Sequence, residues 1–495
     1  MTTRWEWQWI MAHVMKQLSR LIIPFAYEAA EETLALGHSK WWEPKDLHMN
    51  RLFTHIEKLV STESYPFVIG KRYHLTKEGR QTHGLPPGTN HQLTFAGGFM
   101  PDIRLTINQV ECTLFESNVG FLTLDIHYPK QTDIRRLIEA NHQLKKLYNS
   151  KMRLTYLLKG KQVELHLREL TQQLLAPLKV TTFFEASHLN APFQALVFQS
   201  YLLDEPLSEE EVGPLLFWMR RTYTDSYSPN KQDEHPHGNP EVLQLYANSY
   251  WGISLEGCAN LAFIGNHPQN EKYFKMNYLP HVKSTYFYLY LLSLHQRYAL
   301  LHFSMLASES LLSGTGTTDH NLSLHQRMEQ YLQDARLITE LKEKIILFKL
   351  RSVFKQVSNT SHHTAVYNLF QTNLHIDQLL GELHFELDSL SQMVQLKEQK
   401  RSQLQEEAAK QEKEREEDLK TRFNTWVVVL SFAFVLVSTI ADGLSIFEKF
   451  AGSGLPTVGS AEFVWFCLLF LLIPATALGF VAWFLVRLMK KSKRT

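Results

Sequence analysis

The chain has few cysteines and none of the short motifs that mark the common enzyme classes. Its 495 residues include three cysteines that lie far apart, so neither a disulfide framework nor a zinc knuckle is expected. A Walker A loop, a Rossmann glycine pattern, an HExxH helix and a GxSxG turn are all absent from the sequence. We therefore expect that the protein is not an enzyme. We also expect no cofactor, with a divalent cation as the one candidate for a bound cofactor.

An excess of charge of one sign is also missing. The chain has 51 lysines and arginines against 50 aspartates and glutamates. This balance gives no reason to expect a surface that binds nucleic acid directly. Residues 1–20 lack the uninterrupted apolar stretch of a secretory signal, so the N-terminal part is expected to stay in the cytosol.

Long hydrophobic runs, in contrast, are present near the C-terminus. Residues 426–447 and 463–486 are both apolar and long enough, as helices, to cross a hydrocarbon core of about 30 Å. We therefore expect a two-span transmembrane hairpin in residues 425–495. Basic residues flank the pair, whereas Lys449 is the only basic residue of the loop between them. By the positive-inside rule both termini are cytosolic, which predicts a multi-pass protein of the inner (plasma) membrane that contacts lipid.

A charged segment precedes the first apolar run. Residues 397–420 contain neither glycine nor proline and are rich in strong helix formers. One stalk helix is therefore expected over residues 377–424, continuing into the membrane. It begins with an apolar seam made of Leu383, Leu387, Leu390 and Val394. This spacing predicts a neighbouring helix, and identical helices from other subunits of a homo-oligomer are the simplest neighbours.

The N-terminal part is predicted to be an α+β cytosolic domain over residues 1–240 that senses a ligand. Residues 1–60 are expected to be helical. Alternating apolar residues then predict a β-hairpin at 112–128. The further expected elements are a helix at 132–147, strands at 163–167 and 193–203, and a helix opened by a capping box of Ser208 and Glu211.

From Glu241 the chain is predicted to become mostly helical, forming a cytosolic layer over residues 241–376. A strongly apolar helix at 282–306 raises the alternative of a third membrane span. Lys283 and Arg297 lie in or beside it, and a charge at bilayer depth is costly. We therefore expect a buried helix of the soluble domain.

One stretch of the soluble domain is a candidate nucleotide site. Arg220 and Arg221 have the chemistry to hold a phosphate bidentately, and Tyr223 and Tyr227 have the chemistry to stack on a base. The alternative is an ordinary helix end, where cations interact favourably with the C-terminal dipole.

Histidines offer a weaker metal candidate. His235 and His237 lie in one loop with acidic neighbours, as a low-affinity metal site would require. His362 and His363 form an adjacent pair, but adjacent side chains on a helix point about 100° apart. Both clusters are therefore expected to be polar surface.

The layout resembles the CorA family of divalent-cation channels. The matching features are the α+β cytosolic domain, the very long helix, the two terminal spans, the short outer loop and the basic tail. In that family the first span ends with a Gly-Met-Asn motif at the pore mouth. Here Gly443 matches the glycine, whereas Leu444 and Ser445 replace methionine and asparagine.

The resemblance implies a pentamer in which the first span lines a pore and the second faces lipid. A ring of Ser445 hydroxyls, with Asp442 carboxylates below it, would favour cations. Asn424, Ser431 and Ser438 are spaced seven residues apart and would share a polar stripe facing the lumen. The alternative is that these small residues pack helices against each other within the membrane.

A looser similarity is to the divergent CorA-like proteins that accompany type III CRISPR systems. Those proteins lack the Gly-Met-Asn motif, and the group is implicated in responding to nucleotide second messengers. Together the resemblances imply an ion channel or effector that a cytosolic ligand, such as a nucleotide, gates in antiviral defence. Two alternatives stay open: a magnesium-type transporter with a degenerate pore motif, and a membrane-anchored scaffold.

Overall fold

A computed structural model describes most of the chain. The residues outside the description are 1–11, 29–35, 37–38, 47–48, 50, 64, 87, 90, 96–102, 130–132, 150–151, 159, 185–192, 225–226, 265–267, 316–323, 452–460, 469–475, 477–478, 481–482, 484–486 and 488–495. The chain forms two compact units, one of Met1–Leu322 with Glu329–Glu398 and one of Ser323–Met328 with Gln399–Thr495.

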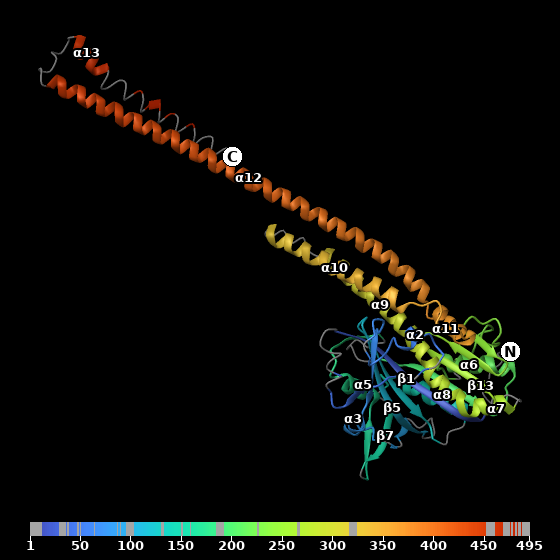
Figure 1. The fold of residues 1–495 in the computed structure, drawn as a ribbon. Helices are drawn as coiled ribbons and strands as arrows, with labels where there is room; N and C mark the ends of the chain where they lie inside the picture. The colour runs from blue at the N-terminus through green and yellow to red at the C-terminus, as the bar shows by residue number, and fades with distance from the viewer. Residues whose placement is uncertain are drawn as a thin grey trace. The chain divides into compact units, whose positions relative to one another are not determined.

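The first unit is built on a mixed sheet of 13 strands (Figure 1). The main strand order is β11-β12-β13-β10-β1-β6-β5-β4-β7-β8, with β9 beside β1 and β3 between β2 and β5. β10 and β13 run parallel, which makes the sheet mixed. The strands are β1 (Val14–Tyr27), β2 (Trp42–Pro44), β3 (Gly70–Leu75), β4 (His91–Phe95), β5 (Ile103–Phe115), β6 (Val119–His127), β7 (Met152–Leu158), β8 (Lys161–Leu165), β9 (Val180–Phe183), β10 (Leu196–Leu203), β11 (Val242–Tyr246), β12 (Ser249–Ile253) and β13 (Gly257–Phe263).

The central strand β1 lies where the sequence predicted a helix. It pairs with β10 on one side and with β6 on the other. Leu21 and Ile23 belong to one hydrophobic cluster, whereas Leu18 and Ile22 belong to a second. A strand that is buried on both faces shows no alternation of apolar and polar residues, so its period is hidden. The prediction of helix over residues 1–60 was therefore wrong at β1, and its first residues, 1–11, lie outside the description.

Other elements of the sheet domain follow the sequence patterns. The predicted hairpin is present as β5 and β6, and the strand predictions are confirmed by β8 and β10. The turn of the hairpin places Asn118 at φ 63°, a left-handed conformation that asparagine tolerates better than most residues. The Ser208–Glu211 capping box is present at the start of its helix.

Residues 242–263 form three strands, so the prediction of a mostly helical chain from Glu241 was wrong there. The strands β11, β12 and β13 extend the sheet beyond β10 and continue the α+β domain past residue 240. Gly257 allows the parallel pairing of β13 with β10, because a Cβ at that position would lie 2.3 Å from the carbonyl oxygen of Val197. Tight backbone packing of this kind gives no periodic signal in the sequence.

Helices cover both faces of the sheet. The first hydrophobic cluster joins one face to α4, α5 and α6, and the second joins the other face to the helices from η2 onward. The helices before α12 are α2 (Thr54–Glu57), α3 (Lys77–Thr82), α4 (Ile134–Lys145), α5 (Leu167–Leu175), α6 (Glu209–Arg221), α7 (Pro268–Tyr273), η2 (Phe274–Tyr278), α8 (Leu279–His281), η3 (Val282–Tyr286), α9 (Phe287–Thr315), α10 (Leu324–Ser352) and α11 (Ser361–Asn373), where η marks a π-helix. The start of α9 is buried in the second cluster, which confirms the buried helix predicted at 282–306.

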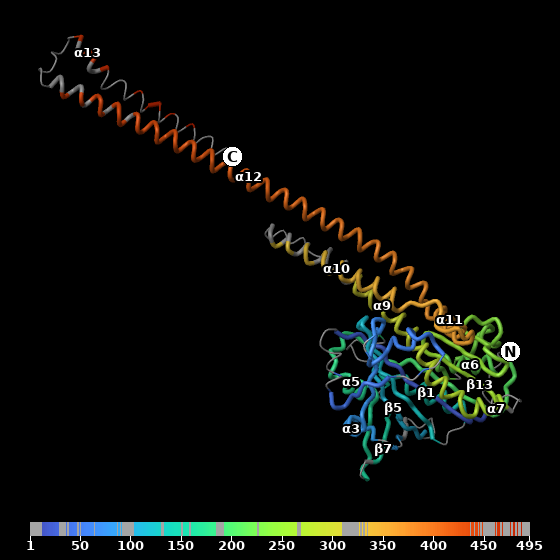
Figure 2. Tube along the Cα trace, in the orientation of Figure 1, coloured from blue at the N-terminus to red at the C-terminus, as the bar shows by residue number. Residues whose placement is uncertain are grey.

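The predicted continuous helix is confirmed as α12 (Ile376–Ala451), which has 76 residues (Figure 2). Its first turns pack in the second hydrophobic cluster, where Leu383 and Leu390 are buried and Leu387 and Val394 are partly buried. Ser304 of α9 donates to Glu386 at 2.7 Å, and Lys342 of α10 donates to Ser391 at 2.8 Å. The chain's own helices therefore cover the seam, so the seam no longer supports self-association.

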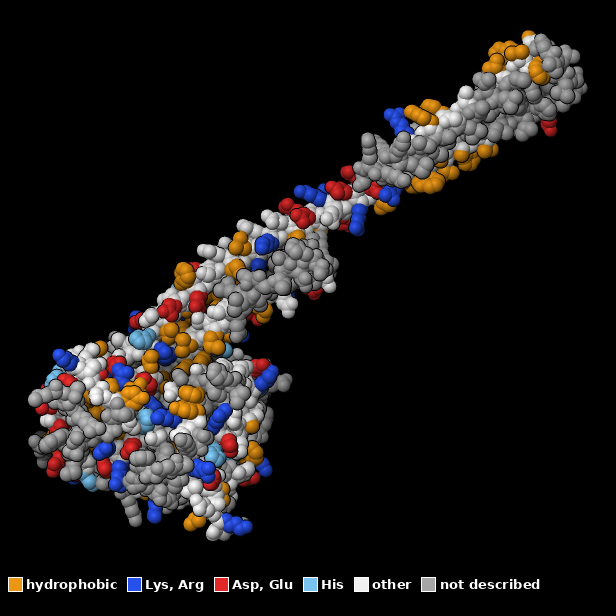
Figure 3. Space-filling model, turned by 180° about the vertical axis from the view of Figure 1, so that it is seen from behind, with side chains coloured by type: hydrophobic (Ala, Val, Ile, Leu, Met, Phe, Trp, Pro, Cys, Tyr) orange, Lys and Arg blue, Asp and Glu red, His pale blue; other side chains and the backbone are white. Residues whose placement is uncertain are grey.

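The later part of α12 is apolar and exposed. Within the described residues, it is the one helix long and apolar enough to cross a membrane, with a mean hydropathy of 2.0 in a window of which 0% is buried. In Figure 3 hydrophobic side chains gather on this part, next to a segment of mixed acidic and basic side chains. Of the second predicted span, the structure describes α13 (Ala461–Cys467) and a few later residues. The rest of that span and the basic tail at 488–495 lie outside the description.

Candidate functional site

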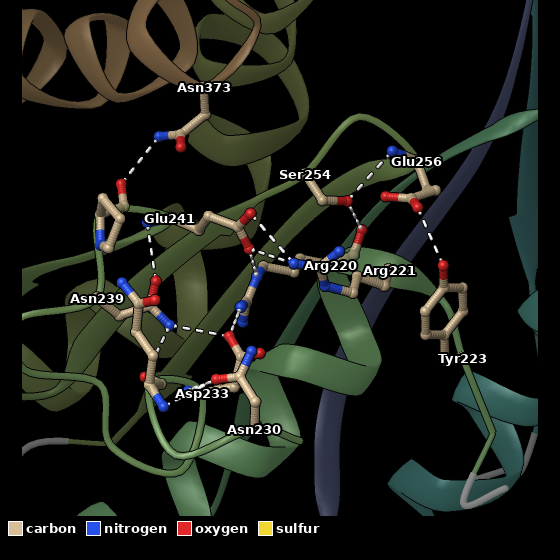
Figure 4. A network of polar contacts seen from close by, with 12 residues as sticks. Arg220, Arg221, Tyr223, Asn230, Asp233, Asn239, Glu241, Ser254, Glu256 and Asn373 are labelled. Atoms are coloured by element: carbon tan, nitrogen blue, oxygen red, sulfur yellow. Dashed lines mark hydrogen bonds and ion pairs between the residues drawn. The ribbon is translucent and has the colours of Figure 1, made fainter. Parts of the chain in front are cut away.

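The predicted nucleotide-site arginines lie at the C-terminal end of α6 and point into a network of acids (Figure 4). The Arg220 side chain is 0% exposed and forms ion pairs with Asp233 and, at 2.8 Å, with Glu241. Arg221 is 25% exposed and pairs with the same Glu241 carboxylate at 2.9 Å. Asn239 donates to Asp233 at 3.0 Å, which helps to hold that carboxylate in place. The two arginines and the two carboxylates therefore neutralise each other's charge within the domain.

The two tyrosines of this stretch are also engaged within the chain. The Tyr223 hydroxyl donates to Glu256 at 3.1 Å, and burial together with Glu256 raises the pKa of Tyr223. The Tyr223 and Tyr227 rings pack against each other with centroids 4.6 Å apart. A phosphate would meet neutralised arginines and an acidic neighbour here. The geometry thus favours the alternative given above, a structural helix end.

The loop histidines His235 and His237 are exposed. His237 contacts Glu209, at the start of α6, with 2.9 Å between Nε2 and Oε1. The group of three described residues whose ligand atoms lie close enough to hold one metal ion includes neither of them. These two side chains therefore belong to the polar surface.

The predicted pore residues all lie on α12. Asn424, Ser431, Ser438 and Ser445 are exposed. Their seven-residue spacing keeps them on one helix face, with a drift of about 20° per heptad in a straight helix. Asp442 is exposed and Gly443 partly so, whereas the Leu444 side chain lies outside the description. The apolar segment therefore carries one polar stripe.

The serine hydroxyls of this stripe are oriented by the helix backbone. Ser431 donates to the carbonyl oxygen of Val427 at 2.8 Å, and Ser445 donates to that of Asp442 at 3.0 Å. Each hydroxyl proton is thus turned toward the helix, while the oxygen keeps acceptor capacity for another group. A row of such oxygens suits a cation better than an anion.

A cavity of about 120 Å³ lies in the first unit, at the hairpin turn between β5 and β6 and the helices α9 and α10. Its walls are largely apolar. Its polar lining residues are Glu116, Ser117, Asn118, His295, His302, Lys344, Arg351 and Ser352. Small-molecule pockets usually have about 300–1,000 Å³, so this cavity fits only a small ligand or one part of a larger one.

Two cavity histidines are neutral at physiological pH. Burial lowers the pKa of His295 to about 3, and the ring stacks on Phe115 with centroids 3.8 Å apart. Burial, with the charge of Lys344 nearby, lowers the pKa of His302 to about 4. The buried Nδ1 atom of His302 makes no hydrogen bond within the described residues. The cavity therefore offers a ligand one unused polar atom in an apolar wall.

The cations at this cavity differ in their partners. Arg351 is paired with Glu116 at 2.6 Å and donates to the carbonyl oxygen of Val68 at 2.6 Å. Lys344 is exposed and forms neither a hydrogen bond nor an ion pair with a described residue. An anionic group is therefore the ligand that this cavity would favour. No sequence pattern pointed to this cavity, because its lining residues come from distant segments that carry no motif.

The apolar segment of α12, its polar stripe and the cavity are the features that bear on function. Comparison of the chain with family models, with curated proteins and with solved structures finds no match.

Proposed function

We propose that the chain is an oligomeric membrane protein that forms an ion pathway gated by a cytosolic ligand. The finer parts of this proposal are the two-span hairpin with both termini cytosolic, a CorA-like fold and a pentamer in the inner membrane. A nucleotide second messenger of antiviral defence stays a candidate ligand. The proposal follows from the continuity of α12.

Because α12 is continuous, one helix contains both a segment packed in the soluble core and an exposed apolar segment. The first turns of α12 pack in the soluble core, where Leu383 and Leu390 are buried. The same helix contains the exposed apolar segment and the polar stripe of Asn424, Ser431, Ser438 and Ser445. Because backbone hydrogen bonds make a helix stiff, a displacement of its packed end is transmitted along its axis. Helix displacement coupled to a population shift is a common gating mechanism.

The cavity is suited to start such a displacement. Five of its lining residues belong to α10, namely Lys344, Leu347, Phe348, Arg351 and Ser352. α10 contacts α12 through Lys342 and Ser391, and also through Lys349 and His384 at 2.7 Å. A ligand that binds the cavity in only one arrangement of α10 would bias the position of α12, as differential binding requires.

Ion flux through liposomes tests this function. We expect purified full-length protein to release a trapped cation when the gating ligand is added, with candidate messengers tried in turn. The double variant Ser431→Leu and Ser438→Leu removes two hydroxyl rings and should raise the permeation barrier by at least about 1.4 kcal/mol, a tenfold loss of flux.

The matched control for this variant is the pair Val429→Leu and Ala433→Leu. These residues lie on the same segment but about 140–180° around the helix from Ser431 and Ser438, so the flux should stay close to that of the wild type. Equal losses in the two double variants would contradict a pore lined by the stripe. Absence of flux with every candidate messenger would favour the scaffold, and rescue of magnesium-dependent growth would favour the transporter.

A further inference from the structure

Three histidines that the sequence scatters converge in the first unit. His281 lies at the end of α8, and His362 and His363 lie in the first turn of α11. One ring nitrogen from each lies within 4.8 Å of the others. The Nε2 atoms of His281 and His363 are 3.0 Å apart. Two ligands of a tetrahedral zinc ion, each bound at about 2.0–2.1 Å, would be separated by roughly 3.3 Å.

The hydrogen bonds of His363 direct a lone pair toward this point. Ser358 donates its one hydroxyl proton to the carbonyl oxygen of Arg51. Its oxygen therefore acts as the acceptor toward His363, whose Nδ1 lies 3.3 Å away. A proton on Nδ1 leaves Nε2 with a free lone pair, the form that a metal ligand requires.

The other two rings have a hydroxyl neighbour in one case and an aromatic neighbour in the other. The Tyr246 hydroxyl lies 3.0 Å from Nδ1 of His362. The buried Tyr286 ring packs edge-on against His281 and His363, with centroids 5.1 and 5.5 Å away. Metal-binding histidines commonly have a hydrogen-bond partner on the second ring nitrogen, as Ser358 and Tyr246 provide here, and it fixes the ring orientation. His363 is 0% exposed, while His281 and His362 are half-buried, so the cluster is built into the fold and still reachable.

The backbone around His281 is unusual. The residue stands between two π-helical segments, η2 and η3. Segments of this kind are rare and occur frequently at functional sites. Without the altered helical pitch, His281 would present its ring in a different direction relative to α11. The prediction of polar surface was wrong for His363, which is buried, because its partner His281 comes from a segment 82 positions away.

We infer that His281, His362 and His363 form a binding site for one transition-metal dication of the zinc type. Three imidazole nitrogens suit zinc, cobalt, nickel or copper and do not suit magnesium, which prefers oxygen ligands. The site is independent of the proposed ion pathway.

Positive charge near the cluster favours an anion as the fourth ligand. Arg51 is exposed, and its charge acts on all three histidines. The N-terminus of α11 adds a positive partial charge. Three neutral ligands leave the ion with its full double charge, so the surroundings favour an anion such as hydroxide or chloride in the open position. The bound ion would tie α11, the helix before α12, to the π-helical segment.

Metal binding to purified full-length protein in detergent tests this inference. Titration with zinc against a chromophoric chelator should give one ion per chain, and magnesium should not compete. His281→Gln should weaken zinc binding by more than the roughly 10–100-fold that an outer partner contributes, and Ser358→Ala by about that range. His235→Gln with His237→Gln is the matched control, because these rings are exposed elsewhere, and it should leave the affinity unchanged.

X-ray absorption of the wild-type zinc complex keeps the inference testable if a variant fails to fold. The spectrum should show three imidazole nitrogens at about 2.0–2.1 Å. A zinc shell dominated by oxygen, or full-affinity binding in a folded His281→Gln variant, would overturn the site. So would the absence of zinc binding by the wild type.

Discussion

Replacing Arg220 by methionine is expected to destabilise the sheet domain by about 3–5 kcal/mol, the usual effect of removing one partner of a buried ion pair. Asp233 is 5% exposed and would be left with a buried negative charge. Arg221→Met should cost about 1 kcal/mol or less, because Arg221 is partly exposed and Arg220 still pairs with Glu241. Urea unfolding of the full-length protein, followed by tryptophan fluorescence, measures both changes.

A double variant separates the loss of the charge pair from the loss of packing. Adding Asp233→Leu to Arg220→Met removes the orphaned carboxylate and should restore part of the lost stability, since apolar replacement of a whole buried pair is often neutral. The thermodynamic cycle gives the coupling between the two residues. Equal destabilisation by Arg220→Met and Arg221→Met would show that the network is not the buried anchor seen in Figure 4.

Lowering the pH from 7 to 5 should destabilise the fold by several kcal/mol. Burial is the main cause that lowers the pKa of His74, His142 and His302 to about 4 and of His295 to about 3. A histidine with a lowered pKa in the folded state contributes stability that is complete above pH 6.5 and is lost as the pH falls. Protonation of each such histidine in the unfolded chain lowers the free energy of unfolding by about 2 kcal/mol at pH 5, since 1.36 kcal/mol corresponds to one pH unit.

The variant His295→Gln tests this acid sensitivity at one position. It should lose about 2 kcal/mol less than the wild type between pH 7 and pH 5, whatever its stability at pH 7. His237→Gln, at an exposed ring, controls for the loss of a histidine as such. Identical pH dependence of His295→Gln and the wild type would contradict the buried neutral state of His295.

Glu111, the buried acidic partner of Arg72 in the sheet, does not produce this effect. Burial alone would raise the pKa of Glu111. The charge of Arg72, with smaller contributions from Arg20 and His74, outweighs this effect and lowers the pKa to about 2. Glu111 therefore keeps its charge between pH 7 and pH 5. Its contribution to stability, present above about pH 4.3, is lost only as the pH falls toward 2.

Local sequence patterns were enough to predict several elements. The absence of glycine and proline over residues 397–420 predicted that α12 is continuous, because nearly every residue there is a strong helix former. The alternation in β5 and β6 and the capping box at Ser208 are signals that neighbouring residues generate among themselves. The apolar character of the later part of α12 follows from composition.

Contacts between distant segments could be identified only in the folded chain. β1 showed no period because both of its faces are buried, the Leu383 seam is covered by helices of the same chain, and His281 meets His363 across 82 positions. Side-chain type and spacing determine how a residue interacts with its neighbours in the same helix or strand. Which partner neutralises Arg220, and which ring faces His363, depends on how the sheet and its helices pack, because those contacts arise only when segments far apart in the chain are brought together.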